Sequence, residues 1–274
     1  MTEQAHWRVD VLRALFILWV LMGVLLASAR VLPVLPDAGV IAICLLLAVP
    51  LAWLGFLRRR LRRGALLTVA LSPKSPWQRR LRGGAPMLLG QCLIAALLAW
   101  WLVLGLVRLD ARSFWLLLIA LMPLWVLLHR ALQRRFAVHV NRRFLRMVTD
   151  RVAGVLLGVV LLIALLALSF HRPVPALSGL SIEGALAAYT AEVTADSAVL
   201  EIGLVVAAAV EALPQWFAQN LAVVLPGTGW QVLTWTLVLL REWLVVWPLL
   251  LLVQAVHGWL DRPRPEPTGV ARSE

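Results

Sequence analysis

The chain has 274 residues, of which 62% are hydrophobic and 15% charged, and its mean hydropathy is +0.87. An average soluble domain is about 45–50% apolar and about 25% charged, so this composition excludes a water-soluble globule and a disordered chain. The 26 Lys and Arg residues against 14 Asp and Glu give a net charge of +12. In a membrane protein this excess reflects basic cytoplasmic loops and does not indicate binding to nucleic acid.

Apolar stretches long enough to cross a bilayer recur along the chain. A hydrocarbon core about 30 Å thick requires about 20 apolar residues in helical form. The first such stretch is too long for a signal peptide and has no convincing cleavage site, so we expect it to be retained. The sequence predicts an all-α, polytopic membrane protein with about six transmembrane helices, at 11–29, 38–57, 86–107, 114–128, 152–170 and 230–260.

Basic residues gather in two segments between these stretches. Residues 58–85 carry nine Lys or Arg and no acid, and residues 130–151 carry seven Arg with Asp150 as their only acid. Because cytoplasmic loops are enriched in Lys and Arg, both segments are predicted to face the cytoplasm. Residues 171–229 carry five acids against Arg172 alone and are predicted to lie outside. Both chain termini are then cytoplasmic, and we expect the protein in the inner membrane of a bacterium.

This layout predicts four parts. They are a five-helix membrane region at 1–170 with basic cytoplasmic loops at 58–85 and 130–151, an extracytoplasmic helical loop at 171–229, a final membrane helix at 230–260 and a disordered tail at 261–274.

The outer loop contains two predicted helices. Ser181 is the expected N-cap of the first, and either Asp196 or Ser197 is the expected N-cap of the second, which covers 199–213. The second helix is apolar on most faces and has about the minimum length for a span. It can lie against the outer leaflet, re-enter the membrane or cross it. We favour an outer amphipathic helix.

The basic loops contain a predicted patch for anionic lipid headgroups or a protein partner. Apolar residues recur every four positions from Leu132 to Val148, which predicts a basic amphipathic helix over 130–150. The alternative is that the basic residues only determine topology. The patch comprises Arg58, Arg59, Arg60, Arg62, Arg63, Arg134, Arg135, Arg142, Arg143 and Arg146.

Arg241 and Glu242 lie inside the last apolar stretch, where ionisable residues indicate a functional site by default. Their side chains leave the helix about 100° apart, so we expect each to need a partner elsewhere and not to pair tightly with the other. They can serve transport or gating, with Glu201 or Glu211 at the mouth of the path, or form a structural ion pair between helices. We favour a third position, at the membrane interface near a belt of tryptophans.

Two further patterns concern packing and cofactors. Gly154 and Gly158 form a GxxxG motif, which predicts close helix packing within the protein or between two copies. A haem would require His129 and His257, both at predicted cytoplasmic helix ends, to face each other. We expect such histidines to cap carbonyls or to contact headgroups instead, and we predict no cofactor.

No catalytic motif is visible in the sequence. It contains no Walker sequence, no HExxH, no GxSxG and no dense acidic cluster for a metal, so no catalytic residue or metal ligand is predicted. The favoured function is a non-catalytic scaffold or accessory subunit of an envelope complex, with protein partners in the membrane and an option of self-association. The alternatives are a channel or transporter subunit that uses Arg241 and Glu242, and a membrane enzyme acting on lipid or envelope precursors.

Overall fold

The computed structural model describes residues 2–70, 84–108, 112–170, 175–191, 193–221 and 228–260. Every element in these ranges is helical, and the all-α, polytopic membrane fold predicted from the sequence is confirmed. The elements are α1 (Thr2–Val31), η1 (Leu32–Val34), α2 (Asp37–Ala70), α4 (Ala85–Arg108), α5 (Arg112–Phe136), α6 (Arg142–Phe170), α7 (Ile182–Thr190), α8 (Ala198–Trp216), η2 (Phe217–Leu221) and α10 (Thr228–Leu260).

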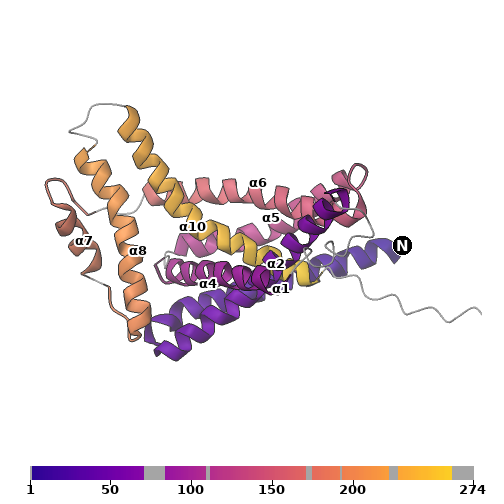
Figure 1. Ribbon diagram of the computed structural model, residues 1–274, viewed down its shortest axis with the longest axis horizontal. Coiled ribbons are helices and arrows are strands. Elements are labelled where there is room, and N and C mark those ends of the chain that lie inside the picture. The colour runs from indigo at the N-terminus through magenta and orange to yellow at the C-terminus, as the bar shows by residue number, and fades with distance from the viewer. Residues whose placement is uncertain are drawn as a thin grey trace, which may run out of the picture.

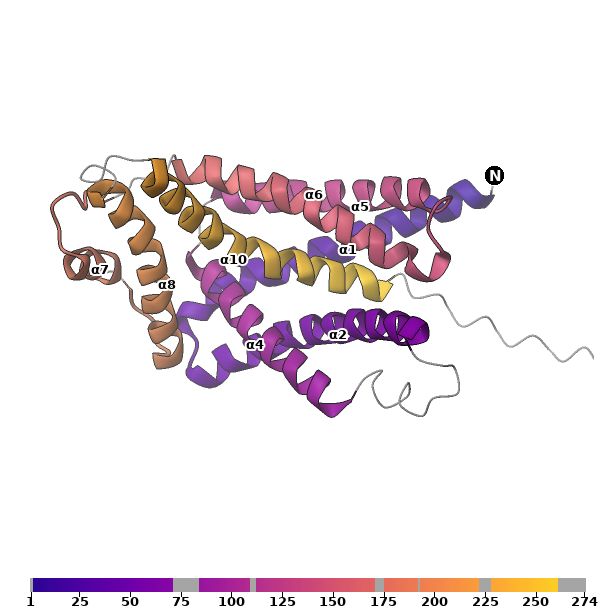
Figure 2. The same ribbon diagram turned by 45° about the horizontal axis from the view of Figure 1, so that its top comes forward.

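Seven of the described helices are long and apolar enough to cross a bilayer. Six of them contain the predicted stretches, and the seventh is α8, in the predicted outer loop. Figures 1 and 2 show α5 and α6 side by side along the long axis of the molecule, whereas α8 lies crosswise at one end in both views. Because α8 is itself long and apolar enough to span, its expected position along the membrane face stays a prediction.

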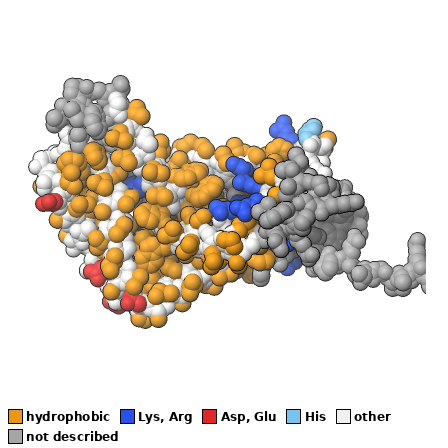
Figure 3. All heavy atoms as spheres, in the orientation of Figure 1, with side chains coloured by type: hydrophobic (Ala, Val, Ile, Leu, Met, Phe, Trp, Pro, Cys, Tyr) orange, Lys and Arg blue, Asp and Glu red, His pale blue; other side chains and the backbone are white. Residues whose placement is uncertain are grey.

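The helix α10 lies at the centre of the bundle and packs against α1, α2, α4, α6 and α8. Its residues from Val246 to Val253 are almost all buried, because neighbours cover most of its surface. The outside of the bundle is also apolar, with Phe16, Leu93 and Leu97 each more than 65% exposed. Figure 3 shows this apolar surface over the middle of the molecule, as expected of a surface that faces lipid.

Charged residues lie at the two ends of the bundle. Figure 3 shows basic side chains toward the end where α2 finishes, and acidic side chains at the opposite end, near α7 and α8. We call the first the basic end and the second the α8 end. The bundle consists of α1, α2, α4, α5, α6 and α10, and each of these helices runs between the two ends. The helix α2 runs toward the basic end and α6 runs away from it, so the two have opposite directions (Figure 2).

Two expected loop structures at the basic end are wrong in detail. The helix α2 continues through 58–70, so Arg58 to Arg63 lie on a helix and not in a loop. The predicted amphipathic helix over 130–150 is divided, because α5 ends at Phe136 and α6 begins at Arg142. The carbonyl of Asn141 accepts hydrogen bonds from Phe144 and Leu145, and asparagine favours such helix starts.

Some predictions fall on residues outside the described ranges. These are the middle of the first basic loop at 71–83, the tail at 261–274 and the side chains of Arg142 and Arg143.

Candidate functional site

The N-terminal end of α8 is fixed to the hairpin between α1 and α2. Ser197 caps the helix, with its hydroxyl oxygen accepting a hydrogen bond from the Leu200 amide at 3.1 Å. The same hydroxyl donates to the carboxylate of Asp37, which also accepts from the Val199 amide at 3.3 Å. The amide of Asp196 donates to the carbonyl of Pro33 at 3.0 Å. Of the two expected caps, Ser197 is therefore the one used.

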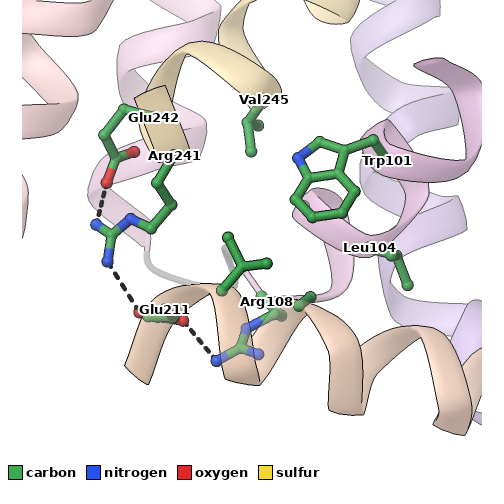
Figure 4. Close-up of a pocket in the computed structure, with 10 residues that line it drawn as sticks. Trp101, Leu104, Arg108, Glu211, Arg241, Glu242 and Val245 are labelled. Carbon is green, nitrogen blue, oxygen red and sulfur yellow. Dashed lines mark hydrogen bonds and ion pairs between the residues drawn. The ribbon is translucent and has the colours of Figure 1, made fainter. Parts of the chain in front are cut away.

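The other half of α8 is held by a four-residue ion cluster. Glu211 accepts from Arg108 of α4 at 2.5 Å and lies 3.5 Å from a guanidinium nitrogen of Arg241 on α10. A second nitrogen of Arg241 contacts the carboxylate of Glu242 (Figure 4). Arg108 also donates to the carbonyl of Leu204 in α8 at 3.3 Å. The cluster contains two cations and two anions and joins three helices.

A small pocket lies beside this cluster. Its wall includes Trp101, Leu104 and Val245 in addition to the charged side chains (Figure 4). Its volume is about 60 Å³, and a water molecule needs about 10–15 Å³ measured in this way. The pocket therefore has room for a few water molecules next to the ion pairs.

The expectation that Arg241 and Glu242 do not pair with each other is wrong. The argument from helix angle concerns the directions of the Cα–Cβ bonds, whereas an arginine side chain is long enough to return toward its neighbour. We also expected a partner on another helix, and Glu211 of α8 is such a partner for Arg241. Glu242 is only 6% exposed, while Glu201, the other acid considered near this site, is exposed.

A second polar cluster lies at the basic end and joins α2, α5, α6 and α10. Asp150 is buried and interacts with His129 through Oδ1 at 2.8 Å. Its second carboxylate oxygen lies 3.7 Å from a guanidinium nitrogen of Arg58. The same nitrogen donates to the side-chain oxygen of Gln254 at 2.5 Å, and the amide nitrogen of Gln254 donates to the Asp150 carbonyl at 3.1 Å.

Two buried histidines meet in this cluster. The rings of His129 and His257 are 4.7 Å apart and nearly perpendicular, and both pack against Trp125. This direct contact between the rings leaves no space for a haem between them. The neighbouring hydroxyl of Thr149 donates to the carbonyl of Leu145 at 2.8 Å. It is therefore not aimed at His129, as a nucleophile paired with a general base would be.

Two glutamines at the basic end each pack against a glycine of the next helix. A Cβ atom on Gly154 would collide with the amide of Gln254, and one on Gly55 would collide with the amide of Gln91. With its amide turned so that the oxygen faces the guanidinium, Gln91 accepts from Arg59 at 2.9 Å. Adjacent arginines of α2 are thus held by glutamines of two different helices, α10 and α4.

The GxxxG motif faces α10 within the same chain. In addition to the contact of Gly154 with Gln254, a Cβ on Gly158 would lie 3.1 Å from Leu250 and 3.5 Å from Trp243. Glycine at these positions allows α6 to approach α10 closely.

The structure separates the predicted arginine patch into different environments. Arg58 and Arg59 contact buried side chains of the bundle, and Arg146 is partly buried. The exposed members are Arg59, Arg60, Arg62, Arg63, Arg134 and Arg135.

Asp150, Gln254 and Arg108 are site residues that the sequence patterns alone did not single out. Asp150 carried a signal, because it is the single acid in a strongly basic segment. Gln254 is a polar residue inside an apolar stretch, which is a weaker signal of the same kind.

Within the described residues, no group of three or more His, Cys, Asp or Glu side chains is arranged to hold a metal ion. No known family model, curated protein or solved structure matches this chain. The two polar clusters are therefore interpreted from their own geometry.

An apolar layer separates the two clusters. Arg241 and Gln254 are about 20 Å apart along α10, at about 1.5 Å per residue. Every residue of α10 from 243 to 253 is apolar, and so are residues 92–107 of α4 and 152–168 of α6, glycines included. Side chains at this depth, such as Leu102, Leu157 and Leu249, are buried to 1% exposure or less. The described helices therefore provide no polar lining between the clusters.

Proposed function

We propose that this protein is a non-catalytic scaffold or accessory subunit of an envelope complex in the bacterial inner membrane. The observation that carries the proposal is the apolar layer between the two polar clusters. A transporter of polar solutes needs polar side chains or a water-filled cavity at this depth, because desolvating a charge in hydrocarbon is costly. The ionisable residues of the bundle instead bond to one another and fix the positions of its helices.

The α7–α8 element, residues 175–220, is the docking surface in this proposal. In addition to the contacts of α8 described above, Gln219 accepts from the Leu177 amide at 2.6 Å and donates to the Pro175 carbonyl at 3.1 Å. Asn220 accepts from the Gly179 amide at 2.8 Å. A segment held by so many specific hydrogen bonds presents a fixed surface, which lowers the entropic cost of binding a partner.

Charge reversal on this surface tests the proposal. Glu183 of α7 and Glu201 of α8 are exposed and form no ion pair within the described residues, so Glu183→Arg with Glu201→Arg should not disturb the fold. Wild-type protein purified in mild detergent should retain a partner in fixed stoichiometry, and the double variant should lose it. Arg60→Glu with Arg63→Glu, at the basic end, is the matched control and should retain the partner. Recovery of the wild type as a lone monomer would contradict the proposal.

Transport is the second candidate, and the pocket beside the ion cluster is the observation in its favour. Its polar wall is formed by Arg108, Glu211, Arg241 and Glu242. Transport through this site predicts that Arg241→Ala and Glu242→Gln change solute or ion flux in reconstituted liposomes. The scaffold proposal predicts no flux in the wild type and no change in the variants. If the wild type shows a flux and both substitutions abolish it, the function is transport and the scaffold proposal is wrong.

A further inference from the structure

We propose that the pocket beside the four-residue ion cluster binds the phosphoethanolamine headgroup of a membrane lipid. The pocket lies between α4, α8 and α10, and its charged wall consists of Arg108, Glu211, Arg241 and Glu242. The inference is independent of the docking role of the α7–α8 element, because it concerns the side of α8 that faces the bundle.

Two polar groups of the pocket wall have no partner in the protein. Glu242 is only 6% exposed, and it contacts Arg241 through one carboxylate oxygen, Oε1. Its other oxygen, Oε2, accepts no hydrogen bond within the part of the chain that the structure describes, and the indole nitrogen of Trp101 donates none there. Because buried polar groups almost always have partners, this open acceptor and open donor indicate a bound polar group.

The two open groups belong to different helices and face the same space. Trp101 lies on α4 and Glu242 on α10, and both line the pocket. In Figure 4 the open oxygen of Glu242 and the ring nitrogen of Trp101 are both turned toward the middle of the pocket. One ligand in the pocket can therefore contact both helices.

The charges of the wall select a ligand that carries both signs. The wall contains two cations and two anions, so a ligand of one sign would leave an uncompensated charge in a partly buried site. The ion pairs use only part of the hydrogen-bonding capacity of guanidinium and carboxylate groups. A phosphoethanolamine group supplies an ammonium donor for Glu242 and phosphate oxygens for Trp101 and Arg108.

The size of the pocket selects a small ammonium group. Its volume is about 60 Å³, which at about 10–15 Å³ for each water-sized atom corresponds to about four to six non-hydrogen atoms. This space suits the ethanolamine part of the headgroup. The trimethylated ammonium of choline is larger, and it has no N–H group to donate to a carboxylate.

The surroundings of the pocket favour a lipid over a soluble zwitterion. Arg108 is the last residue of the apolar segment of α4, so the charged wall lies where the hydrocarbon ends. Leu97, one turn before Trp101, is 69% exposed, and Val206, one turn before Val210, is 49% exposed. This apolar surface beside the pocket provides a place for acyl chains.

The first test fills the pocket without changing its charge. Ala207→Met places a longer side chain in the pocket wall, and Ala96→Met, at an exposed position of α4 outside the pocket, is the matched control. Each protein is purified in non-ionic detergent, and phosphatidylethanolamine, phosphatidylcholine or soluble phosphoethanolamine is added at equal concentration. Bound lipid is counted by native mass spectrometry, and the unfolding midpoint is measured.

The wild type and Ala96→Met should each retain one molecule of phosphatidylethanolamine, which should raise the unfolding midpoint. Phosphatidylcholine and soluble phosphoethanolamine should bind at least about tenfold more weakly. In Ala207→Met the affinity for phosphatidylethanolamine should fall about tenfold or more, because the added side chain occupies the space of the ethanolamine group.

A second pair of variants tests the open donor and does not depend on how Ala207→Met packs. Trp101→Phe removes the indole N–H and keeps an aromatic ring, and Trp19→Phe, at an exposed position of α1, is its control. The affinity for phosphatidylethanolamine should fall about threefold or more in Trp101→Phe and stay unchanged in Trp19→Phe. Without lipid, both variants should unfold at the wild-type midpoint.

Four outcomes would overturn the proposal. Equal binding of phosphatidylcholine would show that the pocket does not recognise the ammonium group, and an equal effect of soluble phosphoethanolamine would exclude a lipid as its source. Retention of the lipid by Ala207→Met would place the binding elsewhere. A lower midpoint of Trp101→Phe without lipid would show that the indole nitrogen serves the fold.

Discussion

At the α8 end of the bundle, Arg108 and Arg241 are matched by Glu211 and Glu242. At the basic end, Asp150 alone faces His129 and Arg58. Both clusters join helices that lie far apart in the sequence, and each lies at one end of the apolar layer. The two clusters therefore differ in how a carboxylate is shared. At the α8 end each guanidinium group contacts a carboxylate, whereas at the basic end one carboxylate is shared by a guanidinium group and an imidazole ring.

The largest effect is expected from Asp150→Asn, which removes the only anion of the basic-end cluster. Arg58 then lies partly buried without a counterion, and His129 loses its charged partner. Breaking a buried pair in this way costs about 3–5 kcal/mol. The free energy of unfolding in mixed micelles should fall by about that amount, whereas Arg151→Gln, at an exposed neighbouring position, should change it by less than about 0.5 kcal/mol. Equal small effects would mean that Asp150 is not the centre of this cluster.

Removal of the corresponding anion at the α8 end should have a smaller and more local effect. In Glu211→Gln, Arg241 keeps its contact with Glu242, and the side chains of Arg108 and Glu211 are each 24% exposed, so water replaces part of the lost interaction. We expect a loss of about 1–2 kcal/mol. Hydrogen exchange should become faster in α8 while the bundle helices remain protected. Glu201→Gln on the exposed face of α8 should leave the exchange unchanged, and faster exchange throughout the bundle would contradict a local role.

A substitution at Gly154 tests the basic-end cluster without altering charge. In Gly154→Ala, the new methyl group displaces the amide of Gln254, which then loses its hydrogen bonds to Arg58 and to the Asp150 carbonyl. The expected loss is about 1 kcal/mol, since Gln254 is flexible and the helices need not separate. Gly90→Ala is the control, because no atom lies within 4 Å of its Cβ and alanine favours helix. A stabilised Gly154→Ala protein would exclude the described packing.

The smallest effect is expected from Arg134→Gln with Arg135→Gln, at the exposed end of α5. Both side chains are exposed, and surface charges of this kind contribute less than about 0.5 kcal/mol each. The unfolding midpoint should be unchanged within about 1 °C. A large decrease would show that these two arginines make internal contacts, as Arg108 and Arg241 do at the α8 end.

Particular residues show how far the sequence alone leads. The six apolar stretches and the N-caps of α7 and α8 could be predicted, because hydrocarbon thickness and helix capping depend on neighbouring residues in the chain. Ser181 and Ser197 both cap the helices assigned to them. The length of α2 could not be predicted in the same way. Its basic end is polar, and a run of arginines is equally compatible with a helix and with a loop.

The pairing of the polar residues required the tertiary structure. Arg58 and Gln254 are 196 positions apart, and Arg108 and Glu211 are 103 apart. Periodicity can place a residue on a face of its own helix, but it does not determine which helix lies opposite that face. The sequence therefore determined which segments enter the membrane and where charge accumulates, since transfer from water to hydrocarbon is largely a property of each segment. Only helix packing decided which charges neutralise one another and which remain in excess, because that depends on the order and the register of neighbouring helices.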